Sequence, residues 1–412
     1  MIDSKKKDSA SGKALSITGI NFATCCSRTK YKNRDDLLLI VLDPGSQVCG
    51  CFTDSSMPSA PVVWSKKNIK KANNLKQKSV LLINAGNANA FTGEEGLIAC
   101  KEKSLALENI FKCDKSNIFF ASTGVIGEKL PYKKIIQHFP YLNKNLYSSG
   151  LKAASNAILT TDLRPKIYSR KFKICNKFFT ISGFAKGSGM IFPNMATMLA
   201  FIFTDFAIDR NSLSSFTKKA VDESFNRISV DGDTSTSDSV FVSTTNKKLL
   251  KIKKNKRPEA LNAFYEEIKK AMVDLAKKIV MDGEGATKFI EIKVKNARNI
   301  GRAKKICFSI ANSLLVKTAI AGEDANWGRI VMAIGKTKVN LRTEKIKIYM
   351  QDFLLCKNGK ALEKVDNASL SRALKKKNIG ILVDLGEGDE EFNVWTSDLT
   401  EGYIKINADY RT

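Results

Sequence analysis

Seven short segments of this 412-residue chain combine glycine, asparagine, serine and threonine between apolar runs. Loops of this kind, held by a rigid scaffold, let backbone amides and small hydroxyls converge on a ligand. Each segment alone is compatible with an ordinary turn, but seven in one chain favour a site. They are NAGNANAFTG (84–93), STGVIGEKLP (122–131), TTDLRP (160–165), GFAKGSGMIFPNMATML (183–199), SVDGDTSTSDS (229–239), GEGATK (283–288) and AGEDANWGR (321–329).

The longest of these segments contains the dipeptide Ala196-Thr197, a small residue followed by a hydroxyl residue that opens an apolar run. A tight turn can strain such a bond, so that the Thr197 hydroxyl attacks the Ala196 carbonyl. Hydrolysis of the resulting ester leaves Thr197 as a new N-terminus. Its α-amine, with a pKa of about 7.7–8.0, can then act as general base for its own hydroxyl. The dipeptide is common, so this hypothesis depends on its surroundings.

His138 is the single histidine of the chain. A histidine-dependent serine or cysteine triad would have to use it, and a histidine-rich metal site is excluded. It stands near Pro140 at the end of an amphipathic stretch, which predicts a helix-end residue. Neither a P-loop nor G-x-G-x-x-G spacing occurs, which disfavours a nucleotide-binding fold. A threonine that supplies its own base suits such a chain.

The composition is that of a globular protein with a basic surface. Hydrophobic residues make up 43% and charged residues 26%, and 68 Lys and Arg against 41 Asp and Glu give a net charge of +27. The lysines are spread along the chain, so we interpret them as a solvated surface and keep polyanion binding as an alternative. No apolar run is long enough to span a membrane, and the lysine-containing N-terminal segment lacks the apolar stretch expected of a secretory signal. A cytoplasmic protein with nine reduced cysteines, without nucleic-acid or membrane partners, is expected.

Hydrophobic periodicity predicts alternating strands and helices. Thr92 and Glu95 form a sequence pattern for a capping box that opens a helix ending near Phe111. The glycine-containing turn GEGDE predicts a hairpin between the strands 380–385 and 391–396. The other expected strands are 35–42, 79–84, 289–294 and 345–350, and the other expected helices run from 211 to 225 and from Pro258 to Gly283. The predicted fold class is α+β, with stacked β-sheets and helical outer layers, rather than a Rossmann fold.

The motifs GMIFPNMATML, NAGNANA, VDGDTSTSD and VKTAIAGEDANWGR together resemble the glutamate/ornithine N-acetyltransferases of arginine biosynthesis, whose precursor cleaves itself into two chains. The resemblance runs from about Gly50 to Thr412. It departs from the family at Ser237, where asparagine is usual, and at Ala325, where proline is usual. The first forty residues fit the family poorly. The resemblance implies an N-terminal-nucleophile-like, self-processed fold.

The resemblance also implies roles for individual residues. Thr197 would be the nucleophile, cleavage would occur between Ala196 and Thr197, and Thr123 with Gly124 would form the oxyanion hole. No metal or organic cofactor is implied. The implied substrate contacts are Thr161, Lys186, Thr197, Glu284, Asn407 and Thr412. A lysine suits a substrate carboxylate and a glutamate suits an ammonium group.

The implied reaction is ping-pong transfer of acetyl from N-acetylornithine to Thr197 and then to glutamate, which gives ornithine and N-acetylglutamate. Cleavage would produce an α chain (1–196) and a β chain (197–412), and the family assembles two of each. Some members also use acetyl-CoA as donor, which the sequence leaves open. Another N-terminal-nucleophile enzyme, an aminopeptidase or amidase with water as acceptor, is the alternative.

Overall fold

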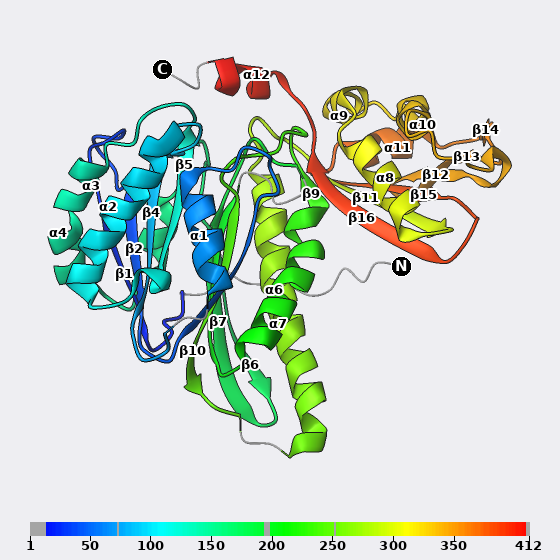
Figure 1. Cartoon of the computed structure of the whole chain (residues 1–412). Helices are drawn as coiled ribbons and strands as arrows, with labels where there is room; N and C mark the ends of the chain where they lie inside the picture. Colours follow the sequence, from blue (N-terminus) through cyan, green and yellow to red (C-terminus); the bar gives the residue numbers. More distant parts are fainter. Residues whose placement is uncertain (1–13, 72–73, 193–197, 251–252, 409–412) are drawn as a thin grey trace. The chain divides into compact units, whose positions relative to one another are not determined.

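A computed structural model describes residues 14–71, 74–192, 198–250 and 253–408 (Figure 1). The chain divides into two compact units. Unit 1 comprises residues 1–187, 194–225 and 235–275, and unit 2 comprises residues 188–193, 226–234 and 276–412. Both units combine β-sheets with helices, so the predicted α+β class is confirmed.

Unit 1 contains two sheets. The first has the order β1-β2-β4-β5 and is antiparallel except for the parallel pair β4 and β5. Its strands are β1 (Ile20–Cys25), β2 (Leu37–Leu42), β4 (Ser79–Asn87) and β5 (Ile118–Val125). The second has the order β3-β10-β8-β7-β6, with β8 and β10 parallel. Its strands are β3 (Gln47–Phe52), β6 (Lys166–Ile174), β7 (Lys177–Lys186), β8 (Leu199–Phe206) and β10 (Ser239–Lys248). The strands expected at 35–42 and 79–84 are β2 and β4.

The two sheets of unit 1 stack on a shared apolar core. Leucines and isoleucines of the first sheet pack against phenylalanines of the second, among them Phe201 and Phe241, whose rings stack 5.6 Å apart. Helix α5 (Leu151–Ala157) and part of α1 (Ala60–Lys70) join this core. A sheet that buries both faces reads as a continuous apolar run, which explains the fully buried sequence of β2.

Helices cover the outer face of each sheet in unit 1 (Figure 1). The first sheet carries α2 (Gly93–Phe111), α3 (Tyr132–Gln137) and α4 (Phe139–Lys144). The second carries α6 (Arg210–Asp222) and the unit 1 part of α7 (Arg257–Met281), where Phe264 stacks on Phe206 at 4.2 Å. His138 joins α3 to α4, as expected of a helix-end histidine. The predicted arrangement of stacked sheets between helical layers is therefore present.

Unit 2 is built on one seven-stranded sheet of order β14-β13-β12-β15-β11-β16-β9. Its strands are β9 (Ile228–Ser229), β11 (Phe289–Ala297), β12 (Lys347–Met350), β13 (Phe353–Lys357), β14 (Lys360–Ala361), β15 (Asn378–Asp384) and β16 (Glu390–Ser397). An aliphatic core joins the sheet to α8 (Ile300–Ala311), α9 (Leu314–Ala321), α10 (Trp327–Gly335) and α11 (Asn367–Leu374). Helix α12 (Glu401–Ala408) follows β16.

Two local predictions are wrong. The expected hairpin does not form, because β11 lies between β15 and β16 and pairs with both, parallel to β15 and antiparallel to β16. The capping box is also absent. Thr92 Oγ1 donates to Asn89 Oδ1 instead of capping α2, and Glu95 binds Lys129. A turn pattern predicts that the chain reverses direction, but it does not predict which strands become neighbours in the sheet.

All nine cysteines lie within the described residues, and all are free. Burial raises the pKa of the thiols of Cys25 and Cys307 to about 12, so they behave as small apolar core residues. No helix in the described part of the chain is long and apolar enough to cross a membrane.

The shared core of unit 1 predicts a large cost for losing Phe241. Phe241→Ala should lower the free energy of unfolding by about 3–5 kcal/mol, because the buried ring contacts Phe52, Phe119 and Phe201. Urea unfolding followed by tryptophan fluorescence measures this. Phe178→Ala is the control: that ring is 60% exposed, and its loss should cost less than about 0.5 kcal/mol. Equal costs for both variants would contradict the described packing.

Candidate active site

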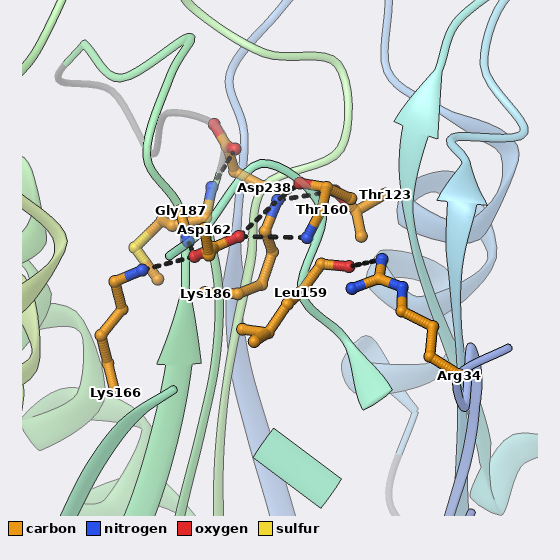
Figure 2. Close-up of polar contacts among 10 residues, drawn as sticks. Arg34, Thr123, Leu159, Thr160, Asp162, Lys166, Lys186, Gly187 and Asp238 are labelled. Carbon is orange, nitrogen blue, oxygen red and sulfur yellow. Dashed lines mark hydrogen bonds and ion pairs between the residues drawn. The ribbon is translucent and has the colours of Figure 1, made fainter. Parts of the chain in front are cut away.

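Lys186, the last residue of β7, is buried in unit 1. Its Nζ donates to Thr123 Oγ1 at 3.0 Å and to Thr160 Oγ1 at 2.9 Å (Figure 2). Because an ammonium group can only donate, both hydroxyl oxygens accept here, and each retains its own hydrogen for another acceptor. The structure thus brings together two of the predicted site residues, Lys186 and Thr123.

Asp162 holds this cluster in place. Its fully buried carboxylate binds Lys166 Nζ at 2.5 Å, lies 4.0 Å from Lys186 Nζ and accepts from the Gly187 nitrogen at 2.7 Å (Figure 2). Burial acts to raise the pKa of Asp162, but the charges of Lys186 and Lys166 outweigh it and lower that pKa below its ordinary value. A carboxylate between two lysines therefore remains charged.

The predicted oxyanion residues lie at the end of β5, where β4 and β5 pair irregularly. Gly124 has φ +130°, and a Cβ at this position would lie 2.2 Å from the backbone carbon of Gly86. Only glycine permits this close approach. Asn84 supports this strand end by donating to the Asn87 carbonyl at 2.8 Å and accepting from Ser122 Oγ at 2.6 Å. The NAGNANA segment thus shapes the strand end that carries Thr123 and Gly124.

The two threonines of TTDLRP, Thr160 and Thr161, differ in their relation to Lys186. Thr160 binds Lys186, and its backbone nitrogen donates to Asp162 Oδ2 at 3.2 Å. Thr161, the predicted contact, is half-buried beside it. Sequence reasoning passed over Thr160 and Asp162. The available signal was the presence of both residues in one polar segment next to a conformationally restricted proline.

Ala196 and Thr197 lie outside the described residues, but two aspartates of the VDGDTSTSD segment bind the chain on either side of them. In unit 2, Asp231 accepts from the nitrogens of Met190 (2.6 Å) and Ile191 (2.8 Å). In unit 1, Asp238 accepts from the Met198 nitrogen at 2.8 Å. Sequence reasoning singled out the segment but not these two carboxyl groups.

Strand register in unit 1 also relates this part of the chain to Lys186. Leu199 pairs with Lys186 on one side and with Ser239 on the other. Lys186 is therefore the cross-strand neighbour of a residue two positions after Thr197.

Glu284 and Asn407 lie together in unit 2. Asn407 Nδ2 donates to Glu284 Oε2 at 2.8 Å, and the Glu284 nitrogen donates to the Ser188 carbonyl at 3.0 Å. A Cβ on Gly189 would lie 2.3 Å from Glu284 Oε2, so the glycine makes room for the carboxylate. Two predicted substrate-binding residues, Asn407 on α12 and Glu284 in the GEGATK turn, are thus in contact. Thr412 lies outside the described residues.

Tyr403 is a further polar residue of this group that sequence reasoning missed. Its hydroxyl donates to Asp231 Oδ2 at 3.2 Å. Burial and the adjacent Asp231 charge raise the pKa of Tyr403, so the phenol remains neutral.

The polar groups of the two units differ in the charge that each can bind. The unit 1 group offers an ammonium and two hydroxyls, which suit a carboxylate or a developing oxyanion. The unit 2 group offers a carboxylate and an amide, which suit an ammonium. An enzyme that transfers an acyl group between amino acids needs groups of each kind.

Comparison with known proteins agrees with that class. Residues 21–412 match the ArgJ family. Proteins named arginine biosynthesis bifunctional protein ArgJ from Nitrobacter winogradskyi and Bradyrhizobium diazoefficiens are each 42% identical over 400 residues, covering 96% of both chains. A crystal structure of the protein of that name from Bacillus halodurans is 38% identical, with a TM-score of 0.47, and covers 52% of this chain and 99% of its own.

The matches over nearly the whole chain confirm the prediction of an acetyltransferase of arginine biosynthesis. The chain belongs to the ArgJ family. The family match begins at residue 21 rather than near Gly50, so the expectation that this part of the N-terminal region fits poorly is wrong. Strand β1, which begins at Ile20, contributes to the core between the sheets.

Asp162 should control stability. Asp162→Asn should lower the free energy of unfolding by about 3–5 kcal/mol, because two buried lysines lose their counter-charge. Since the pKa of Asp162 is lowered by folding, the stabilisation is complete above the unfolded pKa of about 3.9. It is lost as the pH falls through the lower folded value.

Urea titrations of both proteins across the acid range measure the difference between wild type and Asp162→Asn, which should shrink below about pH 4. The exposed Asp54 supplies the control variant Asp54→Asn, with an expected effect under about 0.5 kcal/mol. A difference independent of pH would argue against a charged Asp162.

Proposed function

We propose that this enzyme transfers acetyl from N-acetylornithine to glutamate through an acetyl-Thr197 intermediate. The observation that carries the proposal is the pair of hydrogen bonds from Lys186 to Thr123 and Thr160, at a strand end next to β8. Membership of the ArgJ family supports the arginine-biosynthetic role. Ornithine leaves after the first half-reaction, and the glutamate amine attacks the acetyl-enzyme in the second.

Thr123 and Gly124 stabilise the tetrahedral intermediates in this proposal. The Thr123 oxygen accepts from Lys186, so its own hydrogen can donate to the oxyanion. The nearby ammonium strengthens that hydroxyl as a donor. The backbone N–H of Gly124 is the second proposed donor. Donors that are already oriented need no rearrangement as charge develops, which is the basis of oxyanion stabilisation.

Lys186 and Glu284 would bind the opposite charges of the amino-acid substrates. Thr161, Asn407 and Thr412 are the further proposed contacts. Asn407 supports Glu284 through its 2.8 Å hydrogen bond.

Self-cleavage between Ala196 and Thr197 would generate the nucleophile and give chains 1–196 and 197–412. Cleavage divides the covalent chain at a point different from the boundary of the two compact units. Assembly of two copies of each chain, a cytoplasmic location and use of acetyl-CoA remain predictions from the sequence.

Intact-mass analysis tests the cleavage. The wild-type protein should separate into two fragments that begin at Met1 and Thr197. Thr197→Ala should remain one chain of 45.6 kDa and transfer no acetyl group, because both steps need the hydroxyl. Thr197→Ser, which keeps a hydroxyl, is the matched control and should retain some cleavage. A wild-type chain that stays intact yet transfers acetyl would contradict the mechanism.

Loss of the Thr123 hydroxyl tests the oxyanion hole. Thr123→Val should lower kcat by about 10²–10³-fold with little change in KM, because the donor acts on the transition state. Thr123→Ser should restore most of the rate. Release of ornithine from N-acetylornithine in the presence and absence of glutamate measures both constants. Equal release without glutamate would identify a hydrolase instead.

A further inference from the structure

Asp238 is a buried carboxyl group that the proposed transfer reaction does not use. It immediately precedes β10 and is fully buried in unit 1, beside the Lys186 cluster (Figure 2). Its Oδ1 accepts from the Met198 nitrogen at 2.8 Å. Within the described residues, its Oδ2 has no hydrogen-bond partner. A neutral amide could accept the same hydrogen bond without burying an ionisable group, so the carboxyl calls for a chemical reason.

The protonation state follows from this environment. Burial raises the pKa of Asp238 well above its ordinary value, although the Met198 N–H and the Lys186 charge oppose that change. Burial therefore favours the neutral carboxylic acid at this position. The 2.8 Å bond from an N–H fixes the orientation of the other oxygen.

Asp238 holds the residue that directly follows the proposed nucleophile, since Met198 comes after Thr197 in the sequence. An acid hydrogen-bonded to one backbone nitrogen is a candidate proton donor for the peptide nitrogen of the preceding residue. Met198 is also held by its carbonyl, which accepts from the Ser239 nitrogen at 3.1 Å.

Self-cleavage requires such an acid, because an amide nitrogen leaves poorly unless it gains a proton. The Thr197 α-amine cannot help, since it does not exist until the bond is broken. His138, the single histidine, joins α3 to α4 in the helical layer on the outer face of the first sheet. It is thus separated by that sheet from the strands that carry Lys186 and Asp238.

We propose that Asp238 transfers the proton in the self-cleavage between Ala196 and Thr197. As the Thr197 Oγ–C bond forms and the C–N bond breaks, the Oδ2 proton passes to the Thr197 nitrogen. The carboxylate so formed accepts the proton released from the Thr197 hydroxyl, which regenerates the acid. Water then hydrolyses the ester. This inference rests on the proposed self-cleavage and assigns the residue that makes it possible.

The test is the rate of cleavage of freshly translated full-length chains, followed by intact mass. Asp238→Asn keeps the volume and the acceptor for Met198 but carries no acidic proton, so cleavage should slow by about 100-fold or more. Asp238→Glu keeps the acid but overfills the buried site, so it should cleave faster than the asparagine variant and slower than wild type.

The order of the two variants separates proton transfer from a structural role. A residue needed only for packing and hydrogen bonding would tolerate the isosteric asparagine better than the larger glutamate. Cleavage of Asp238→Asn at or above the rate of Asp238→Glu would therefore overturn the proposal. Thermal melting of each Asp238 variant, compared with that of the uncut Thr197→Ala protein, reports whether the variant is folded. The order of the two cleavage rates remains decisive even if Asp238→Asn lowers the Tm.

Asp36 supplies a matched control. It is also buried, accepts from a backbone nitrogen (Ser27, 2.6 Å) and has an Oδ2 without a partner among the described residues. Asp36→Asn should cleave within about twofold of wild type, and slowing equal to that of Asp238→Asn would also overturn the proposal. A wild-type chain that is never cleaved would instead refute the proposed function, so the two failures are distinguishable.

Discussion

The buried carboxylate of Asp162 is the interaction on which the unit 1 site depends. Two lysines and two backbone nitrogens converge on it, and charges out of water are tolerated only with partners of this kind. The nearby Asp162 carboxylate favours the ammonium form of Lys186, and an ammonium group can only donate in its hydrogen bonds to Thr123 and Thr160. The hydroxyl hydrogens are then free to act on a substrate. An ion pair of this kind contributes little to stability at a protein surface. In this buried site it determines how the neighbouring hydroxyl groups can act.

The glycines and asparagines around this pair have a second task, which is to bring backbone close to backbone. Gly124 lies against Gly86 because neither carries a side chain. Asn84 links the two strands at this irregular pairing by donating to the Asn87 carbonyl of β4 and accepting from Ser122 of β5. Such strand ends position a site more accurately than a free loop, because each polar group is tied to a sheet whose register is fixed by its buried core.

The VDGDTSTSD segment contains one carboxyl group that fixes the backbone of a neighbouring segment and another that is proposed to transfer a proton. Asp231 satisfies the nitrogen of Met190, which has φ +56° and therefore needs an external hydrogen bond to maintain that conformation. Asp238 holds Met198. Burial raises the pKa of both carboxyl groups, yet they differ in exposure and in partners. The half-buried Asp231 accepts from several N–H groups, whereas Asp238 is fully buried and its Oδ2 has no partner within the described residues.

Sequence alone determined the class, the family resemblance and most local elements, because these depend on periodicity and on short motifs. Strands β2 and β4 follow from uninterrupted apolar runs, and α7 follows from a long amphipathic pattern ended by Gly283. Only the tertiary structure decided that β11 separates β15 from β16, that Thr160 binds Lys186, and that Asp162 and Asp238 are buried. The physical reason is that pairing, burial and charge compensation arise between residues far apart in the chain, and a pattern of neighbours carries no record of them.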